Sequence, residues 1–230
     1  ATRLVRMTAF AAMAGVLQAM VIRGTTPALI GTALMLFVLG LEAMEPLSQE
    51  VDQPDRTDSL PIERGELLVR HLIAPAIALV PFALIAAASA VAVLGTTRAI
   101  APAAILALPT ILAGAGGGVV SIVRDAPDPA KGSSQQAFVP PEMAGISSAM
   151  RIGLPILISA LAASTILLVR QAVRLGNSPT GAALRGAVGA CLLIFLIGFW
   201  VRRRDQWRRK IRQFMSEGQS YTKQQRSTPA

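Results

Sequence analysis

The sequence has few charged and aromatic residues, one cysteine and one histidine. Only 15% of its 230 residues are charged, against about 25% in ordinary soluble domains, and aromatic residues make up 4%. Cys191 stands alone inside an apolar run and His71 has no second histidine, which excludes a disulfide framework and the paired ligands of common zinc sites. We interpret Cys191 as a small apolar side chain that fills space between helices.

Long apolar runs take the place of the missing charges. Hydrophobic residues make up 53% of the chain and the mean hydropathy is +0.54. Apolar runs of helix length alternate with short charged segments, as expected for helices that cross a bilayer. The sequence therefore predicts an all-α polytopic integral membrane protein with about six transmembrane helices. The expected spans are residues 7–22, 27–44, 72–94, 100–123, 152–169 and 186–201.

The positions of the basic residues predict the orientation. The chain carries 22 Lys and Arg against 13 Asp and Glu. If both termini and the two long loops, 46–71 and 124–151, are cytoplasmic, 17 basic residues lie inside and 5 outside, which satisfies the positive-inside rule. We therefore expect a multi-pass protein of the plasma (inner) membrane with cytoplasmic N- and C-termini. Arg170, Arg174 and Arg185 fit this pattern least well, because they fall on the outer side.

The basic C-terminal segment predicts contact with lipid. Residues 202–230 hold nine basic side chains directly after the last span, so we divide the chain into a transmembrane domain, 1–201, and a basic cytoplasmic tail, 202–230. Anionic lipid accounts for this charge, and nucleic acid is disfavoured because no recognition module accompanies it. Arg208, Arg209 and Lys210 are expected at the lipid surface.

Prolines and glycines inside the spans predict bends and close helix packing. Proline removes a backbone donor and clashes with the preceding turn, so we expect kinks at Pro75, Pro81, Pro102, Pro109 and Pro155. Gly114 and Gly118 form a GxxxG pair, which lets a neighbouring helix approach closely.

The connection between the second and third spans concentrates acidic residues. Eight of the 13 acids lie in residues 41–71. The simplest interpretation is a solvated linker. However, the apolar residues Leu47, Val51, Leu60 and Ile62 are interleaved with the charges and give a short helix an apolar edge that could dock in a groove. We interpret this loop as a contact with another protein. Glu42, the one acid inside a span, is expected to be solvated or paired with an arginine.

This loop resembles the coupling segment of ABC exporter permeases of the type-2 class, particularly the alanine-rich ones of actinobacteria. The resemblance is carried by Glu45-Pro46-Leu47, Asp55-Arg56, Asp58, Leu60-Pro61 and Arg64-Gly65, followed at once by a span. A second likeness is Pro140 to Gly145, leading to Arg151 and Pro155. In that family the loop between spans two and three seats on the ATP-binding subunit, and six spans with both ends inside are usual. The resemblance implies a coupling loop over residues 45–70, with contacts from Glu45, Pro46, Asp55, Arg56, Asp58, Pro61 and Arg64.

Catalytic interpretations find little support in the sequence. Lys131-Gly132-Ser133-Ser134 lacks the order and spacing of a phosphate-binding loop. The acids of residues 52–58 could hold a divalent metal for phosphoryl transfer on lipid, but they lack the spaced Asp and Gly pattern of such sites. We therefore expect no enzyme, and no catalytic, cofactor or metal site in this chain.

The sequence as a whole predicts the transmembrane permease half of an ATP-driven exporter. ATP is expected on a separate ATP-binding subunit, and a second permease half is expected as a homodimer, a fused copy or a different chain. The alternative is a secondary transporter or another polytopic membrane protein that ATP does not drive. The chain begins Ala-Thr-Arg, so we expect it to be a piece of a longer polypeptide.

Overall fold

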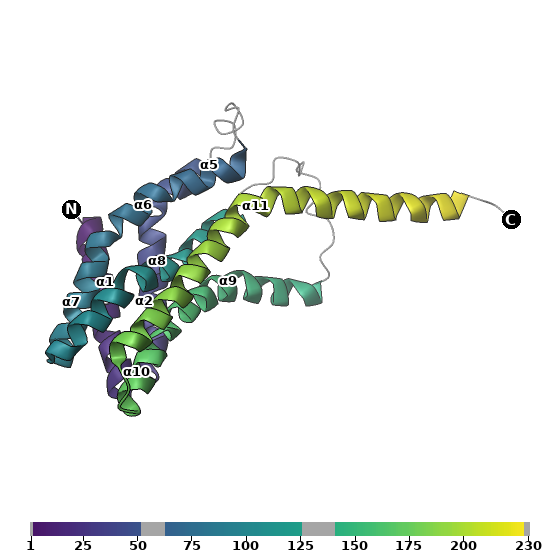
Figure 1. The fold of residues 1–230 in the computed structure, drawn as a ribbon. Coiled ribbons are helices and arrows are strands. Elements are labelled where there is room, and N and C mark those ends of the chain that lie inside the picture. The colour runs from purple at the N-terminus through teal and green to yellow at the C-terminus, as the bar shows by residue number, and fades with distance from the viewer. Residues whose placement is uncertain (1, 52–62, 126–140, 228–230) are drawn as a thin grey trace.

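The computed structural model describes residues 2–51, 63–125 and 141–227, and within these ranges all regular structure is helical (Figure 1). The helices are α1 (Thr2–Arg23), α2 (Ala28–Ala43), α3 (Glu45–Val51), α5 (Arg64–His71), α6 (Ile73–Ala78), α7 (Val80–Leu94), α8 (Ile100–Asp125), α9 (Pro141–Ser164), α10 (Ile166–Arg174) and α11 (Pro179–Ser227), with a 3-10 helix, η1 (Thr97–Ala99), before α8.

The prediction of an all-α polytopic membrane protein is confirmed, although the helix lengths differ from those expected. In the part of the chain that the structure describes, four segments are long and apolar enough to span a bilayer singly: residues 2–23, 97–124, 152–174 and 179–204. The α5–α6 segment and α7 form a fifth when taken as one span bent by 42°. Among the expected spans, the second is shorter than a typical transmembrane helix: the 16 residues of α2 extend about 24 Å at 1.5 Å per residue. The first span, expected to be short, is part of a helix of 22 residues.

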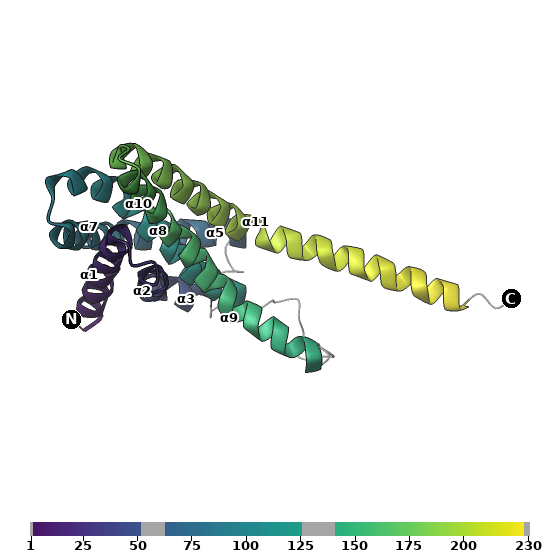
Figure 2. The ribbon, with the colours of Figure 1, turned by 90° about the horizontal axis from the view of Figure 1, so that it is seen from below.

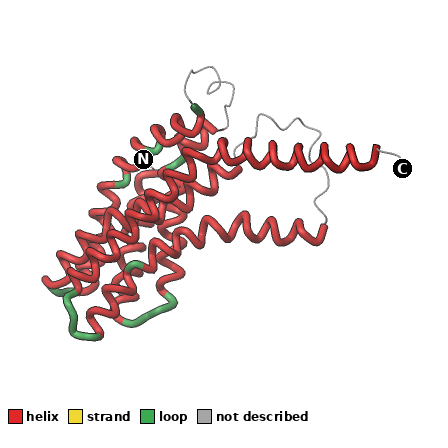
Figure 3. The backbone as a smooth tube through the Cα atoms, turned by 45° about the vertical axis from the view of Figure 1, so that its right-hand side comes forward, coloured by secondary structure: helices red, strands yellow, loops and turns green. Residues whose placement is uncertain are grey.

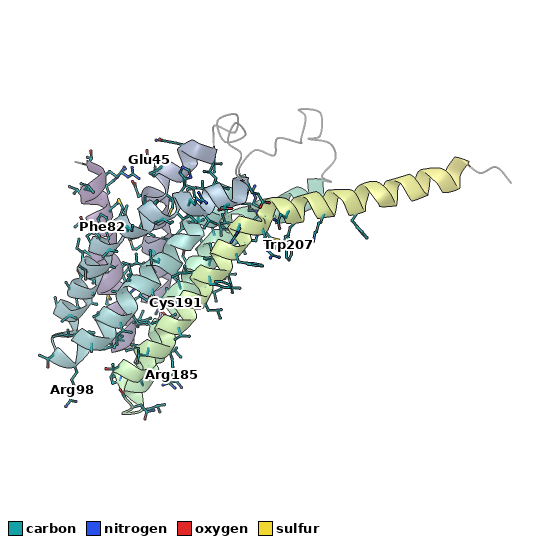
Figure 4. All side chains as sticks on the ribbon, turned by 45° about the horizontal axis from the view of Figure 1, so that its top comes forward. Glu45, Phe82, Arg98, Arg185, Cys191 and Trp207 are labelled. Carbon is teal, nitrogen blue, oxygen red and sulfur yellow. The ribbon has the colours of Figure 1, made fainter. Side chains whose placement is uncertain are left out.

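The spans run back and forth between two ends of a bundle. The turns 24–27, 95–99 and 175–178 lie together at one end, and α3 and α5 lie at the other (Figure 3). We call the first the Arg98 end and the second the Glu45 end, after the residues labelled there in Figure 4. The C-terminal part of α11 and the N-terminal part of α9 project from the bundle on the same side (Figures 1 and 2).

Helix α8 is the centre of the bundle and packs against α2, α7, α9 and α11. Residues 113–120 of α8 are all buried. A Cβ on Gly118 would lie 2.8 Å from the carbonyl carbon of Gly40 in α2, and one on Gly117 would lie 2.3 Å from the Pro155 carbonyl oxygen in α9. The close approach predicted for the GxxxG pair is thus confirmed, and the neighbour is α2 of the same chain.

Of the five prolines expected to bend helices, Pro75 and Pro81 lie in the first turns after the breaks at Leu72 and Leu79. Pro102 lies in the first turn of α8. The chain turns by 42° between α6 and α7, where Pro81 lacks the N–H that would continue the helix. Pro109 and Pro155 lie inside α8 and α9, which continue through them. The break between α9 and α10 falls at Thr165, whose hydroxyl oxygen lies 3.3 Å from that of Thr110 in α8.

Helix α11 differs from the expectation in two ways. It begins at Pro179 and continues without interruption to Ser227, so the boundary expected at residue 201 falls inside a helix. Cys191 is exposed on its surface, so the prediction that this side chain fills space between helices is wrong.

Candidate functional site

The candidate coupling segment, residues 45–70, leaves and re-enters the bundle at the Glu45 end. Only Met44 separates α2 from α3, and only Leu72 separates α5 from α6. Helices α3 and α5 also contact each other. Both ends of the segment are therefore directly continuous with apolar helices of the bundle, α2 and α6.

Helix α3 is attached to the bundle through its apolar side chains. Leu47 and Val51 are only 1% and 3% exposed and belong to the main hydrophobic core, where α3 packs against α8. The prediction that these two residues form an edge for an external partner is therefore wrong. Leu60 and Ile62, the other members of that edge, lie outside the described residues. Glu45 and Pro46 remain exposed on the outward surface of α3.

Helix α5 lies directly on the backbone of α11. A Cβ on Gly65 would lie 2.2 Å from the carbonyl oxygen of Arg202, so only glycine permits this approach. Leu67 and Leu68 are buried on the same short helix. At its start, the Gln206 amide donates to a Glu63 carboxylate oxygen at 3.0 Å, which adds a polar contact between this helix and α11.

An ion-pair cluster joins the first turns of α1 to the end of α2 and the start of α3. Arg6 lies 3.0 Å from a Glu42 carboxylate oxygen, and Arg3 lies 2.5 Å from a Glu45 oxygen. Arg3 also donates to the backbone carbonyl of Glu42. The pairing of Glu42 with an arginine is thus confirmed. Sequence reasoning overlooked Arg3 and Arg6 as its partners, although their place at the lip of the first span put them at the same end as Glu42.

The other predicted contact residues are only partly covered by the structure. Asp55, Arg56, Asp58 and Pro61 lie outside the described residues. Arg64 begins α5, and nothing is described of its side chain. Of the predicted lipid-facing residues, Arg208 and Arg209 lie in α11 with side chains outside the description, whereas Lys210 is exposed.

A groove of about 640 Å³ lies between α8, α9 and α11 beside the start of the tail. Apolar side chains form most of its wall, and Arg124, Arg203 and Arg204 line it together with the ring of Trp207. The Arg203 guanidinium lies 4.9 Å from the Phe199 ring centroid, a cation–π distance. Such a combination of aromatic rings and guanidinium groups suits the boundary between lipid tails and headgroups.

Comparison with known proteins adds nothing to this geometry. No protein-family model, curated protein or solved structure matches the chain. Among the described residues, no three His, Cys, Asp or Glu side chains are grouped so that they could hold a metal ion. A function for this chain therefore has to be inferred from its own residues.

Proposed function

We propose that the chain is the transmembrane permease half of an ATP-driven ABC-type exporter, and that it couples to a separate ATP-binding subunit through residues 45–70. The observation that carries the proposal is the attachment of this segment. Its two ends continue into α2 and α6, and they pack on α8 and α11. Force applied to the exposed surface of α3 or α5 would therefore reach the bundle through α2, α6, α8 and α11.

The proposed mechanism is mechanical. Closure of the ATP-binding subunits would press on the surface around Glu45 and Pro46, which are exposed. Close-packed interiors transmit displacement rather than absorb it, and the backbone contact between Gly65 and Arg202 leaves no space for α5 to yield. Motion would then reach a pathway between this chain and a second permease half. ATP binding and hydrolysis would both belong to the partner subunit.

We assign the Glu45 end to the cytoplasmic side of the plasma membrane, with both chain termini inside. The positive-inside asymmetry supports this orientation. In a Cys191→Ser background, needed because Cys191 is exposed, a cysteine at Thr96 should react with an impermeant reagent applied to intact cells. A cysteine at Ser220 should stay protected. The reverse pattern would contradict the assignment.

Anionic lipid is the partner we assign to the tail. Arg208, Arg209 and Lys210 follow the groove that Arg203 and Trp207 line. Each basic residue near an anionic surface contributes about 1 kcal/mol at moderate salt. The start of the tail would therefore lie at the inner leaflet, beside the coupling segment.

The decisive experiment reverses two charges in the segment. Asp55→Lys with Asp58→Lys should weaken association with the ATP-binding subunit by about 1 to 3 kcal/mol, the range for partly desolvated interface charges. Co-purification and stimulated ATP hydrolysis in proteoliposomes measure this. The matched control reverses two charges at the opposite end, Arg174→Glu with Arg185→Glu, and should leave association unchanged.

Two results would count against the proposal. Equal weakening by the control would show that the effect is not specific to the segment. If no ATP-binding subunit co-purifies with the unaltered chain under any nucleotide condition, the exporter function falls and the secondary transporter becomes the leading candidate.

A further inference from the structure

A second feature of the molecule, at the opposite end from the coupling segment, is a cavity of about 330 Å³. It lies between α1, α7, α8 and α10, and its wall is mainly apolar, with Ala90, Leu106 and Val169 among the lining side chains. Thr96, Arg98 and Asn177 also line it and are exposed. The cavity therefore opens at the end of the bundle where Arg98 lies; Figure 4 labels Arg98 there.

A mostly buried glutamine lines this apolar space. Gln18 of α1 lines the cavity and is 8% exposed, and its side chain forms no hydrogen bond with any residue that the structure describes. The amide gains free energy from a hydrogen bond in an apolar environment. A polar group of an occupant in the cavity would satisfy it.

The end of the bundle at which the cavity opens is basic, and Arg98 lies in the cavity wall. No acid occurs in residues 1–41, 67–124 or 143–204, which form all the spans that reach this end. Arg23 donates to the Val93 carbonyl, and Arg170 donates to the Gly24 carbonyl and the Thr26 hydroxyl. In the described parts of the chain no carboxylate pairs with Arg98, which is left to attract an anion from outside.

The volume limits the size of the occupant. An apolar cavity of about 150 Å³ holds one benzene molecule, so a volume of about 330 Å³ accommodates roughly a dozen carbon atoms by the same measure. That is one alkyl chain of moderate length. It is too little for both chains of a phospholipid.

We propose that this cavity binds a single-chain anionic amphiphile whose alkyl chain occupies the apolar space and whose anionic head lies at Arg98. The amide of Gln18 binds a hydroxyl or carbonyl group carried on the chain. Gln18 lies five residues before the end of α1, about 7.5 Å along the helix axis, so that group is several carbons from the head. This inference goes beyond the proposed function and does not depend on it, because the cavity and the coupling segment lie at opposite ends.

Photolabelling of the full chain tests the proposal. The chain is reconstituted in phosphatidylcholine nanodiscs and labelled with a diazirine derivative of dodecanoate, and the labelled peptides are identified by mass spectrometry. Labelling should saturate, should map to peptides of α1, α7 and α10, and should be displaced by excess dodecanoate. Ala103→Phe, which places a ring in the cavity, should abolish it.

Two further variants separate the two contacts. Arg98→Gln should weaken competition by dodecanoate about three- to fivefold, as for an exposed ion pair, and should leave competition by dodecanol unchanged. Gln18→Leu should weaken competition by a chain-hydroxylated dodecanoate about two- to tenfold, as for one hydrogen bond. Competition by plain dodecanoate should not become weaker in this variant. Arg174→Gln removes an exposed charge at the same end that is not among the residues lining the cavity, and it is the matched control.

Each of the opposite results overturns part or all of the proposal. Labelling that does not saturate, or that falls mainly on the lipid-exposed surface of α11 around Leu192 and Phe195, shows partition into the bilayer and no site. If Arg98→Gln and Arg174→Gln weaken competition equally, the anionic head does not bind specifically at Arg98. If Gln18→Leu leaves competition by both forms of dodecanoate unchanged, or weakens both equally, the amide does not bind the ligand. Thermal unfolding of each variant separates loss of binding from loss of fold.

Discussion

The two ends of the bundle stabilise their arginines in different ways. At the Glu45 end, carboxylates supply the partners, as in the pairs Arg3–Glu45 and Arg6–Glu42. At the Arg98 end the described residues include no carboxylate partner, and backbone carbonyls and a threonine hydroxyl take this role for Arg23 and Arg170. The first end thus combines charges of both signs on a folded surface, whereas the second remains positive and attracts anions.

This difference predicts a different sensitivity to salt. The ion pairs at the Glu45 end are partly exposed, and such pairs contribute little and weaken as ionic strength rises. Arg170 is 9% exposed, and screening reaches a buried hydrogen-bonded group much less. Substitutions at the two ends can therefore be ranked by burial.

The largest effect is expected from Gly65→Leu at the Glu45 end. The new side chain would meet the backbone of Arg202, where a Cβ already lies 2.2 Å from the carbonyl oxygen. Separation of α5 from α11 should lower the free energy of unfolding by about 3 kcal/mol, measured by SDS titration in mixed micelles. Gly189→Leu on α11 is the control, since a Cβ there has no atom within 4 Å. Similar losses in both variants would contradict a special role for the α5–α11 contact.

A smaller effect is expected from Arg170→Gln at the Arg98 end. The change removes the guanidinium bonds to Thr26 at 2.7 Å and to the Gly24 carbonyl at 3.0 Å. Hydrogen bonds of a charged group contribute about 1.5 to 3 kcal/mol, so a loss of about 2 kcal/mol is expected, with little change between low and high salt. Arg174→Gln, an exposed position one turn later, should have almost no effect. A loss that disappears at high salt would show that Arg170 acts through long-range charge.

The smallest effect is expected from Glu42→Gln at the Glu45 end. This change removes the ion pairs with Arg6 and Arg3, whose side chains are 58% and 38% exposed. A loss of about 0.5 kcal/mol is expected at low salt and none at high salt. Unfolding measured at both salt concentrations decides this, with Arg6→Gln as the reciprocal variant. A salt-independent loss would mean that the cluster is shielded from solvent.

Much of the fold was predictable, because the signals that reveal it are local. The six expected apolar stretches lie in helices. They were predictable because the mean hydropathy of a stretch of sequence identifies segments that are stable inside a bilayer. The close packing at Gly114 and Gly118 was also predictable, because glycine spacing along one helix is visible in the sequence. An unpaired charge near the bilayer has a high energy, so Glu42 was expected to be either solvated or paired with an arginine, and the structure shows the pairing.

The residues that form the candidate sites were less predictable from the sequence. Leu47 and Val51 were expected to face a partner and are buried in the chain's own core. Gln18 was overlooked, although a polar residue within an apolar span is itself a signal of a site. Its importance depends on a cavity formed by helices far apart in the sequence.

The sequence by itself determined that this chain lies in a membrane, that its acids gather at one end, and that the other end is basic. Only the tertiary structure decided which side of each helix is buried, as the outward position of Cys191 and the inward position of Leu47 illustrate. The physical reason is that lipid tails and a protein core are equally apolar. A membrane helix therefore carries little amphipathic pattern, and the side it buries is set by packing against its neighbours.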